Sequence, residues 1–155
     1  MSNLWTLSKH VRHTDVLMPG NTIPQMFWNA VQQRNQKIWL REKKRGIWQS
    51  WNWAHAGVAV REVAMGLAAL GMAPGDRTSI LSNTVLEWMI ADLGVLSAGG
   101  VSNGIYPTDA TEQVEYLCTD SGTSICFVEG DEQLDKLLEV RDRLPLLRWT
   151  TSPTR

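Results

Sequence analysis

The sequence predicts an α/β protein in which an N-terminal β-hairpin precedes a partial, mainly parallel, doubly wound sheet with helices on both faces. Two observations support this fold class. Short runs rich in Val, Ile, Phe and Thr alternate with amphipathic or apolar segments that are long enough for helices. Strands separated by such helices pair in parallel, and we expect the crossovers to be right-handed. The junctions between the segments carry helix caps and turn glycines, which fix where each element starts and stops.

The first part of the chain is predicted to form a polar arm, a helix and the hairpin. Residues 1–21 show no sustained hydrophobic period, and they end in a turn. Thr22 and Gln25 have the spacing of a capping box before a helix over Ile23–Asn35. The hairpin strands are expected over Lys37–Glu42 and Ile47–Trp51, joined by Lys43–Gly46, with a broad aromatic face formed by Trp39, Trp48, Trp51 and Trp53.

The rest of the chain alternates strands and helices. Asn52 is expected to cap an amphipathic helix that Gly71 ends. Capping boxes at Thr84 with Glu87 and at Asp109 with Glu112 are expected to open the next two helices. These helices run to Ser97 and over Ala110–Asp120, and a last one carries Leu134, Leu137, Leu138 and Val140. The strands are expected over Arg77–Leu81, Val101–Ile105 and Ser124–Val128, with another starting within Leu146–Thr150.

The composition is that of an ordinary globular domain. The 155 residues are 43% hydrophobic and 20% charged, with a net charge of −1, which excludes the basic surface of a nucleic-acid-binding domain. The basic cluster Arg41–Arg45 is interpreted as a solvated hairpin turn. We expect no signal peptide, because charged residues interrupt any apolar run at the N-terminus, and the most apolar window, Trp88–Val101, is too short to span a bilayer. We therefore predict a cytoplasmic protein without a transmembrane segment, and leave peripheral membrane association open.

The cysteines and histidines do not form a recognisable site. Cys118 and Cys126 have no metal-ligand spacing, and we expect both to be buried in a protein from a reducing compartment. His10 and His13 fall in the polar arm, and His55 falls in the first turn of a helix. Surface or capping roles are predicted for all three histidines.

The glycine-rich and acidic motifs were each compared with a known chemistry. The run Gly99–Gly104 fits the start of a phosphate-binding P-loop, but Ile105-Tyr106 stands where Lys and Ser/Thr are needed. No Gly-x-Gly-x-x-Gly motif is present, which argues against a dinucleotide site of the Rossmann kind. A receiver-domain site built on Asp76, Asp92, Asp109 and Asp120 fails because Ser82-Asn83 follows the first strand. Asp92 is expected to be a buried, hydrogen-bonded carboxylate. We assign no catalytic, cofactor-binding or metal-binding residue.

An ordered set of motifs nevertheless resembles the opening part of an adenylate-forming (AMP-binding) enzyme of the long-chain fatty-acid–CoA ligase type. These motifs are Trp51-Asn-Trp53, Gly66-Leu-Ala-Ala-Leu-Gly-Met-Ala-Pro-Gly-Asp-Arg77, Ser82-Asn-Thr-Val-Leu-Glu-Trp88, Ala98-Gly-Gly100, Gly104-Ile-Tyr-Pro-Thr108 and Asp120-Ser-Gly122. The resemblance assigns residues 22–148 to the N-terminal part of the acyl-CoA synthetase domain and 1–21 to an arm. It implies an incomplete N-terminal domain of the adenylate-forming fold.

The resemblance also implies a reaction for the full-length family. A fatty acid, ATP and magnesium give an acyl-adenylate, from which coenzyme A then takes the acyl group. The family's Ser/Thr/Gly-rich loop with Lys, its aromatic-Gly-x-Thr-Glu motif, its ribose-binding Asp and its C-terminal Lys are not found in this sequence. We therefore expect the chain alone to be inactive and to bind none of these cofactors. Residues 149–155 are interpreted as an atypical tail left by truncation or a frameshift.

Two alternatives remain open from the residues themselves. One is a non-catalytic α/β binding or interaction module, in which an exposed sheet edge favours self-association. The other is a flavodoxin-like ligand binder.

Overall fold

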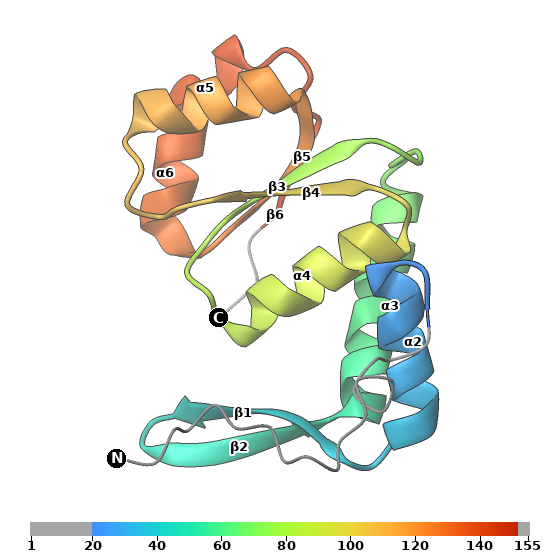
Figure 1. The fold of residues 1–155 in the computed structure, drawn as a ribbon. Helices are drawn as coiled ribbons and strands as arrows, with labels where there is room; N and C mark the ends of the chain where they lie inside the picture. The colour runs from blue at the N-terminus through green and yellow to red at the C-terminus, as the bar shows by residue number, and fades with distance from the viewer. Residues whose placement is uncertain (1–19, 152–155) are drawn as a thin grey trace, which may run out of the picture.

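The computed structural model of the protein describes residues 20–151 (Figure 1). It confirms the α/β class and the predicted order of the elements. The helices are α2 (Ile23–Arg34), α3 (Trp53–Ala69), α4 (Leu86–Ser97), α5 (Thr111–Ser121), α6 (Gly130–Val140) and the 3₁₀ turn η1 (Arg141–Arg143). The strands are β1 (Ile38–Lys44), β2 (Ile47–Asn52), β3 (Arg77–Leu81), β4 (Val101–Ile105), β5 (Thr123–Val128) and β6 (Trp149–Thr151).

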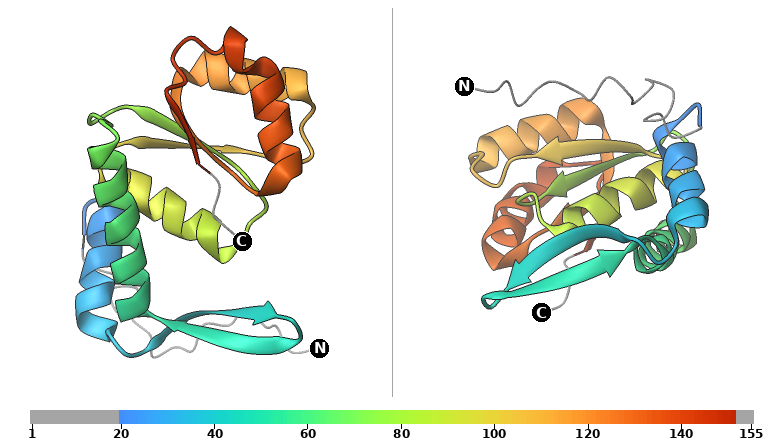
Figure 2. Two further views of the ribbon diagram at one scale, coloured as in Figure 1. Left: turned by 180° about the vertical axis from the view of Figure 1, so that it is seen from behind. Right: turned by 60° about the horizontal axis from the view of Figure 1, so that its bottom comes forward.

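The strands form two separate sheets. β1 and β2 pair antiparallel through a tight turn at Arg45 and Gly46, which both have positive φ. The other four strands are parallel, in the order β4-β3-β5-β6. The chain therefore steps from β3 to β4 on one side and then returns past β3 to β5 on the other. This reversal puts α5 and α6 on one face of the sheet and α4 on the opposite face (Figures 1 and 2).

The buried apolar residues form three clusters that follow these layers. The cluster beneath α5 and α6 includes Leu81, Val114 and Leu137. A second cluster joins α2, α3, the hairpin and α4, and a third joins the end of α3 to α4 and β5. Because α4 contributes to the last two clusters, it connects the sheet to the hairpin and its helices.

The aromatic cluster is smaller than predicted. The Phe27 ring lies 5.2 Å from Trp28, 6.1 Å from Trp39 and 6.0 Å from Trp53 between ring centroids. Trp48, in contrast, is 64% exposed. Trp48 and Trp51 are an odd number of residues apart on β2, so their side chains point to opposite faces of the hairpin.

Two of the predicted helix caps are formed. The Thr22 hydroxyl accepts a hydrogen bond from the backbone N–H of Gln25 at 3.3 Å, although Gln25 itself accepts from Asn21 and not from Thr22. Asn52 Oδ1 accepts from the backbone N–H of His55 at 2.8 Å. At the other end of α3, Gly71 adopts φ +81°, the left-handed conformation expected of a residue that ends a helix.

The capping boxes predicted for α4 and α5 are wrong. The N-cap residues are Val85 and Ala110, and neither makes a side-chain cap hydrogen bond. Each helix starts one residue later than the spacing suggested, so Thr84 and Asp109 precede the capping position. Glu87 instead contacts Lys44 of the hairpin.

Several predicted burial states also differ. Asp92 is half-buried and not fully buried, because it lies at the open side of α4 beside Met89 and Leu93. Leu138 is 49% exposed, so the apolar face of α6 is narrower than the sequence suggested. Cys118 and Cys126 are buried and free, as predicted. The polar arm with His10 and His13 lies almost entirely outside the described residues.

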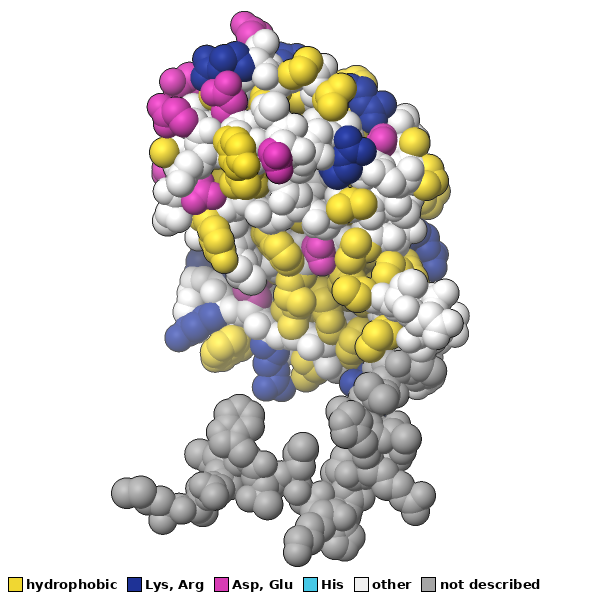
Figure 3. All heavy atoms as spheres, turned by 45° about the horizontal axis from the view of Figure 1, so that its top comes forward, with side chains coloured by type: hydrophobic (Ala, Val, Ile, Leu, Met, Phe, Trp, Pro, Cys, Tyr) yellow, Lys and Arg dark blue, Asp and Glu magenta, His cyan; other side chains and the backbone are white. Residues whose placement is uncertain are grey.

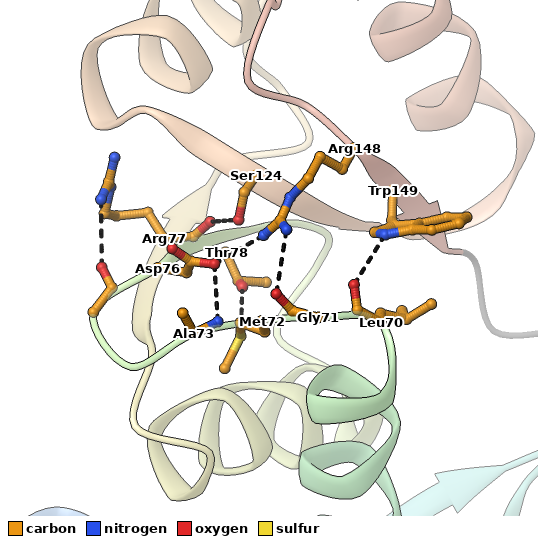
Figure 4. A network of polar contacts seen from close by, with 11 residues as sticks. Leu70, Gly71, Met72, Ala73, Asp76, Arg77, Thr78, Ser124, Arg148 and Trp149 are labelled. Carbon is orange, nitrogen blue, oxygen red and sulfur yellow. Dashed lines mark hydrogen bonds and ion pairs between the residues drawn. The ribbon is translucent and has the colours of Figure 1, made fainter.

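The end of the described chain is fastened to the turn between α3 and β3 (Figure 4). The Arg148 guanidinium donates to Gly71 O at 3.2 Å and pairs with Asp76 at 2.8 Å. The Trp149 indole donates to Leu70 O at 3.2 Å. These side chains satisfy carbonyls at the end of α3, where a cation also complements the helix dipole. Trp149–Thr151 thus continue the sheet as β6, although the sequence marked residues 149–155 as an atypical tail.

The α3–α4 crossing depends on a glycine and generates the first prediction. A Cβ on Gly94 would lie 2.5 Å from Val63 Cγ1 and 2.8 Å from Val63 Cβ, and the second of these atoms cannot move without its backbone. Gly94→Ala should lower the free energy of unfolding by about 1–3 kcal/mol. Gly66→Ala is the matched control, because nothing lies within 4 Å of that position. It should be neutral or stabilising by up to about 1 kcal/mol. Urea unfolding compares the variants, and equal stabilities would contradict the packing argument.

The Arg148–Asp76 contact predicts a pH dependence. A hydrogen bond from the Ala73 N–H and the nearby Arg148 charge lower the pKa of Asp76 below its ordinary 3.8, against the effect of burial. A carboxyl group whose pKa is lower in the folded state stabilises the fold at pH values above its unfolded-state pKa. This stabilisation is lost as the pH falls through the folded-state pKa. Asp76→Asn should therefore be less stable than the wild type at pH 7. The two proteins should converge in acid below pH 3.8. Unfolding curves at several pH values check this, and a constant difference would refute it.

Candidate functional site

A cleft lies beside β3 and β5, where the order in which the chain adds strands to the parallel sheet reverses. The carboxyl ends of β3 and β5 are neighbours in the sheet, and the chain leaves them toward opposite faces. In open α/β sheets, ligands bind in the crevice outside the strand ends at such a point. The cleft measures about 830 Å³, which falls in the size range of small-molecule sites. Topology and volume together make it the candidate site.

The inner surface of the cleft is mainly apolar. It is formed by side chains from α3, β3, α4 and β5, among them Val63, Ile80, Trp88, Ile90, Ala91 and Phe127. The sequence puts apolar residues here because both strands are buried between layers and α4 is apolar over most of its length. Such a surface can bind an apolar group and excludes water from it.

Glu129 holds the two strand ends together at the rim. Its Oε2 accepts hydrogen bonds from Asn83 N at 2.7 Å, Ser82 Oγ at 3.0 Å and Asn83 Nδ2 at 3.1 Å. Burial acts to raise the pKa of Glu129, but these hydrogen bonds outweigh it, and the pKa lies below its ordinary 4.5. Glu129 is therefore an ionised carboxylate with a structural task, and it lacks the raised pKa of a general acid.

Lys44 connects the hairpin to α4 across the cleft. Its Nζ lies 3.2 Å from Glu42 Oε2 and 3.3 Å from Glu87 Oε1. The hydrogen bond to Glu42, followed by the interactions with Glu87, raises the pKa of Lys44 above its ordinary value. Both pairs are partly exposed, so their net energy is small. Their effect is to position the hairpin tip as one wall of the cleft.

The charges at the rim are mostly negative. Glu42, Glu87, Glu129 and Asp131 line the cleft with Lys44 as their counterpart. No His or Cys lines it, and residues 20–151 contain no group of His, Cys, Asp and Glu side chains that could hold a metal ion. The cleft therefore offers binding surface but no nucleophile–base pair, and its rim disfavours polyanions such as a triphosphate.

The motifs examined in the sequence lie away from the cleft. Gly99 has φ +83° in the turn before β4, at the opposite end of the strands, which agrees with its interpretation as a turn glycine. Asp92 lies in a shallow depression between α2 and α4 that is lined mainly by apolar side chains. Hydrophobic side chains gather on one face of the molecule (Figure 3). His55 is exposed beside Trp51. The sequence did not predict the contact of Ser82 and Asn83 with Glu129, although Ser82 and Glu129 directly follow β3 and β5.

Comparison with known proteins now identifies the family. A family model described as AMP-binding enzyme matches residues 27–153. The chain belongs to this family. It is 32% identical over 152 residues to the long-chain-fatty-acid–CoA ligase ACSBG2 of Xenopus laevis, covering 94% of this chain and 21% of that protein. It is 37% identical over 103 residues to the long-chain-fatty-acid–CoA ligase FadD15 of Mycobacterium bovis, covering 66% of this chain and 17% of that protein. The chain thus spans about a fifth of the length of these relatives.

Solved structures agree on the fold. The anthranilate CoA ligase AuaEII superposes with a TM-score of 0.76 at 19% identity, over 92% of this chain and 27% of that one. The N-terminal domain of FACL13 from Mycobacterium tuberculosis gives a TM-score of 0.74 at 19% identity, over 86% of this chain and 34% of that one. The observed architecture is therefore that of N-terminal domains of adenylate-forming enzymes. No helix within residues 20–151 is both long and apolar enough to cross a membrane.

The Glu129 contacts generate a third prediction. Glu129→Ala should lower the free energy of unfolding by about 1–3 kcal/mol, because it leaves the Asn83 N–H and two side-chain donors without their acceptor. It should also speed amide exchange at Asn83. The matched control is Glu139→Ala, which changes an exposed carboxylate on α6 that does not line the cleft, and its effect should stay within about 0.5 kcal/mol. Unchanged exchange at Asn83 would contradict the assignment.

Proposed function

We propose that this chain is the N-terminal portion of an ATP-dependent long-chain fatty-acid–CoA ligase and has no ligase activity by itself. The complete enzyme would convert a fatty acid to its acyl-adenylate with ATP and magnesium, and would then form the thioester with coenzyme A. The chain alone would bind none of these cofactors. The observation that carries the proposal is the match to the AMP-binding family over residues 27–153, in a chain that covers only 21% of a long-chain ligase.

The geometry of the cleft supports the proposal that the chain alone has no ligase activity. Its rim carries one lysine against four carboxylates, and that lysine already pairs with two of them. Adenylate formation needs preorganised cations and amides that neutralise the triphosphate and orient the carboxylate. That charge balance is the reverse of what the chemistry requires, so the reactive groups would come from other parts of the ligase.

A direct assay tests the inactivity. The purified chain is incubated with palmitate, ATP, magnesium and coenzyme A, with the Xenopus laevis ligase as the positive control. We expect no palmitoyl-CoA above the enzyme-free background. Palmitoyl-CoA formed by the chain alone would overturn this part of the proposal.

A chimera tests the assignment to a long-chain ligase. Residues 22–151 replace the matching segment of the Xenopus laevis ligase, and palmitoyl-CoA formation is measured. We expect activity, because the family match and the fold extend over this segment. The chimera with Gly66→Ala serves as a control for tolerated changes. A folded chimera that forms no palmitoyl-CoA would count against the proposal.

A second candidate is the non-catalytic interaction module, with self-association through a sheet edge. It is favoured by the outer edges of β4 and β6, which have no partner strand among residues 20–151, and by exposed apolar side chains such as Ile47 and Trp48. Light scattering after size-exclusion chromatography distinguishes the candidates. A single species of defined size with cooperative unfolding favours a self-sufficient module, and a dimer shows its self-association, whereas soluble aggregate favours a ligase portion.

The free, buried cysteines support a reducing, cytoplasmic location for the chain. Peripheral association with a membrane is tested separately by vesicle flotation.

A further inference from the structure

The charges of the chain are segregated along the molecule, although their sum is only −1. Residues 20–52 carry six Lys or Arg side chains and one Glu, whereas residues 110–143 carry three Lys or Arg and nine Asp or Glu. The hairpin of β1 and β2 belongs to the first segment, and α5 and α6 belong to the second. Figures 1 and 2 place these elements at opposite ends of the molecule. The hairpin is therefore the positive pole of the molecule, and the α5–α6 end is the acidic pole.

The cations of the hairpin that lack an acidic partner point away from the cleft. Glu42 and Lys44 pair with each other on the side of β1 that borders the cleft. Successive side chains of a strand point to opposite faces, so Arg41 and Lys43 point to the other side. Arg45 occupies the turn at the end of the same hairpin. Within residues 20–151, Arg41, Lys43 and Arg45 are exposed and pair with no carboxylate.

An exposed tryptophan lies among these cations. Trp48 stands opposite Lys43 in the β1–β2 register, and directly opposed residues share a face of the sheet. Its side chain is 64% exposed, and that of Ile47, the next residue toward the turn, is 71% exposed. Solvation accounts for a basic turn, but it gives no reason for an indole held out of the core beside that turn. The hairpin face is thus formed by Arg41, Lys43, Arg45 and Trp48.

We propose that the hairpin face binds the surface of an anionic phospholipid bilayer. The Trp48 indole would enter the interfacial layer, which suits both its apolar ring and its polar N–H. The three cations would contact the anionic headgroups, which attract basic residues close to the surface. The acidic pole would face away from the bilayer, where distance and salt weaken its repulsion. The inference goes beyond the ligase assignment and does not depend on it.

Other occupants match the hairpin face less well. Residues 1–19 carry Lys9 and Arg12 against Asp15, so this arm adds positive charge to the face and does not neutralise it. A nucleic acid complements the cations, but Trp48 is followed by no row of aromatic side chains on which successive bases stack. An anionic bilayer uses both the cations and the exposed apolar side chain.

Flotation with lipid vesicles tests the charge requirement. The purified chain is mixed with vesicles of phosphatidylcholine alone or of phosphatidylcholine and phosphatidylserine in equal parts. We expect the chain to float with the anionic vesicles only. Binding should weaken as the salt concentration rises to about 1 M, where the Debye length is roughly 3 Å. Equal flotation with both kinds of vesicle, or none with the anionic ones, would overturn the proposal.

Matched arginine variants locate the binding surface. Arg41→Gln should lower the partition coefficient onto anionic vesicles about fivefold, the contribution of one basic residue near such a surface. Arg141→Gln removes the same charge from an exposed position at the acidic pole, and it should change the coefficient by less than about twofold. Equal losses in the two variants would show that only net charge matters, which overturns the assignment to the hairpin.

Matched aromatic variants test the insertion of Trp48. Trp48→Ala should lower the partition coefficient roughly tenfold, because less apolar area is buried in the bilayer. Tyr116→Ala changes a side chain on α5 that is 65% exposed, and it should leave the coefficient unchanged. Lipids with brominated acyl chains should quench the tryptophan emission of the bound wild type, and Trp48→Ala should lose most of this quenching. Circular dichroism checks that both variants fold. Full quenching in Trp48→Ala would overturn the insertion.

The remaining outcomes identify other occupants of the hairpin face. Flotation that appears only after removal of residues 1–19 shows that the arm occupies it. A single-stranded oligonucleotide that binds the chain when anionic vesicles do not shows a nucleic-acid surface. Oligomers that Arg41→Gln dissociates and Arg141→Gln leaves intact show a second copy on the face. Each of these results overturns the bilayer as the partner. A folded, inactive chimera of a chain that binds anionic vesicles refutes the ligase assignment alone.

Discussion

The close crossing of α3 and α4 is the contact on which the rest of the structure depends. Within residues 20–151, α3 and α4 both pack against the sheet and the hairpin layer, and the two helices approach closely because position 94 has no side chain. Interiors are packed densely enough that one added methyl group is felt. The position of the hairpin, and with it one wall of the cleft, therefore follows from the distance between two helix axes.

The cleft shows how a binding surface can arise without a catalytic centre. The strand ends at the reversal point are held by Glu129, and the hairpin wall is held by Lys44. Glu129 accepts three hydrogen bonds from Ser82 and Asn83, which fixes the strand ends at this rim.

The sequence was sufficient for the fold and insufficient for the site. Hydrophobic periodicity and turn residues predicted every strand and helix of residues 20–151 to within a few positions, because these signals are local. At α4 the predicted capping residue Glu87 pairs with the distant Lys44. At α5 the cap is shifted by one residue, and Gln113 accepts a hydrogen bond from the backbone N–H of Ala110. The Ser82–Glu129 contact joins residues 47 positions apart, and nothing local encodes such a pairing. The tryptophans do not share one face, because Trp48 and Trp51 are an odd number of residues apart on a strand.

The fastening of β6 to the end of α3 has a consequence for synthesis on the ribosome. The Trp149 indole and the Leu70 carbonyl that it reaches are 79 residues apart in the chain. Helix α3 is therefore complete long before the groups that satisfy its terminal carbonyls have been made. Non-local contacts of this kind slow folding, because the loop must close before they contribute. During translation, the carbonyls of Leu70 and Gly71 will lack these donors until Arg148 and Trp149 emerge from the exit tunnel.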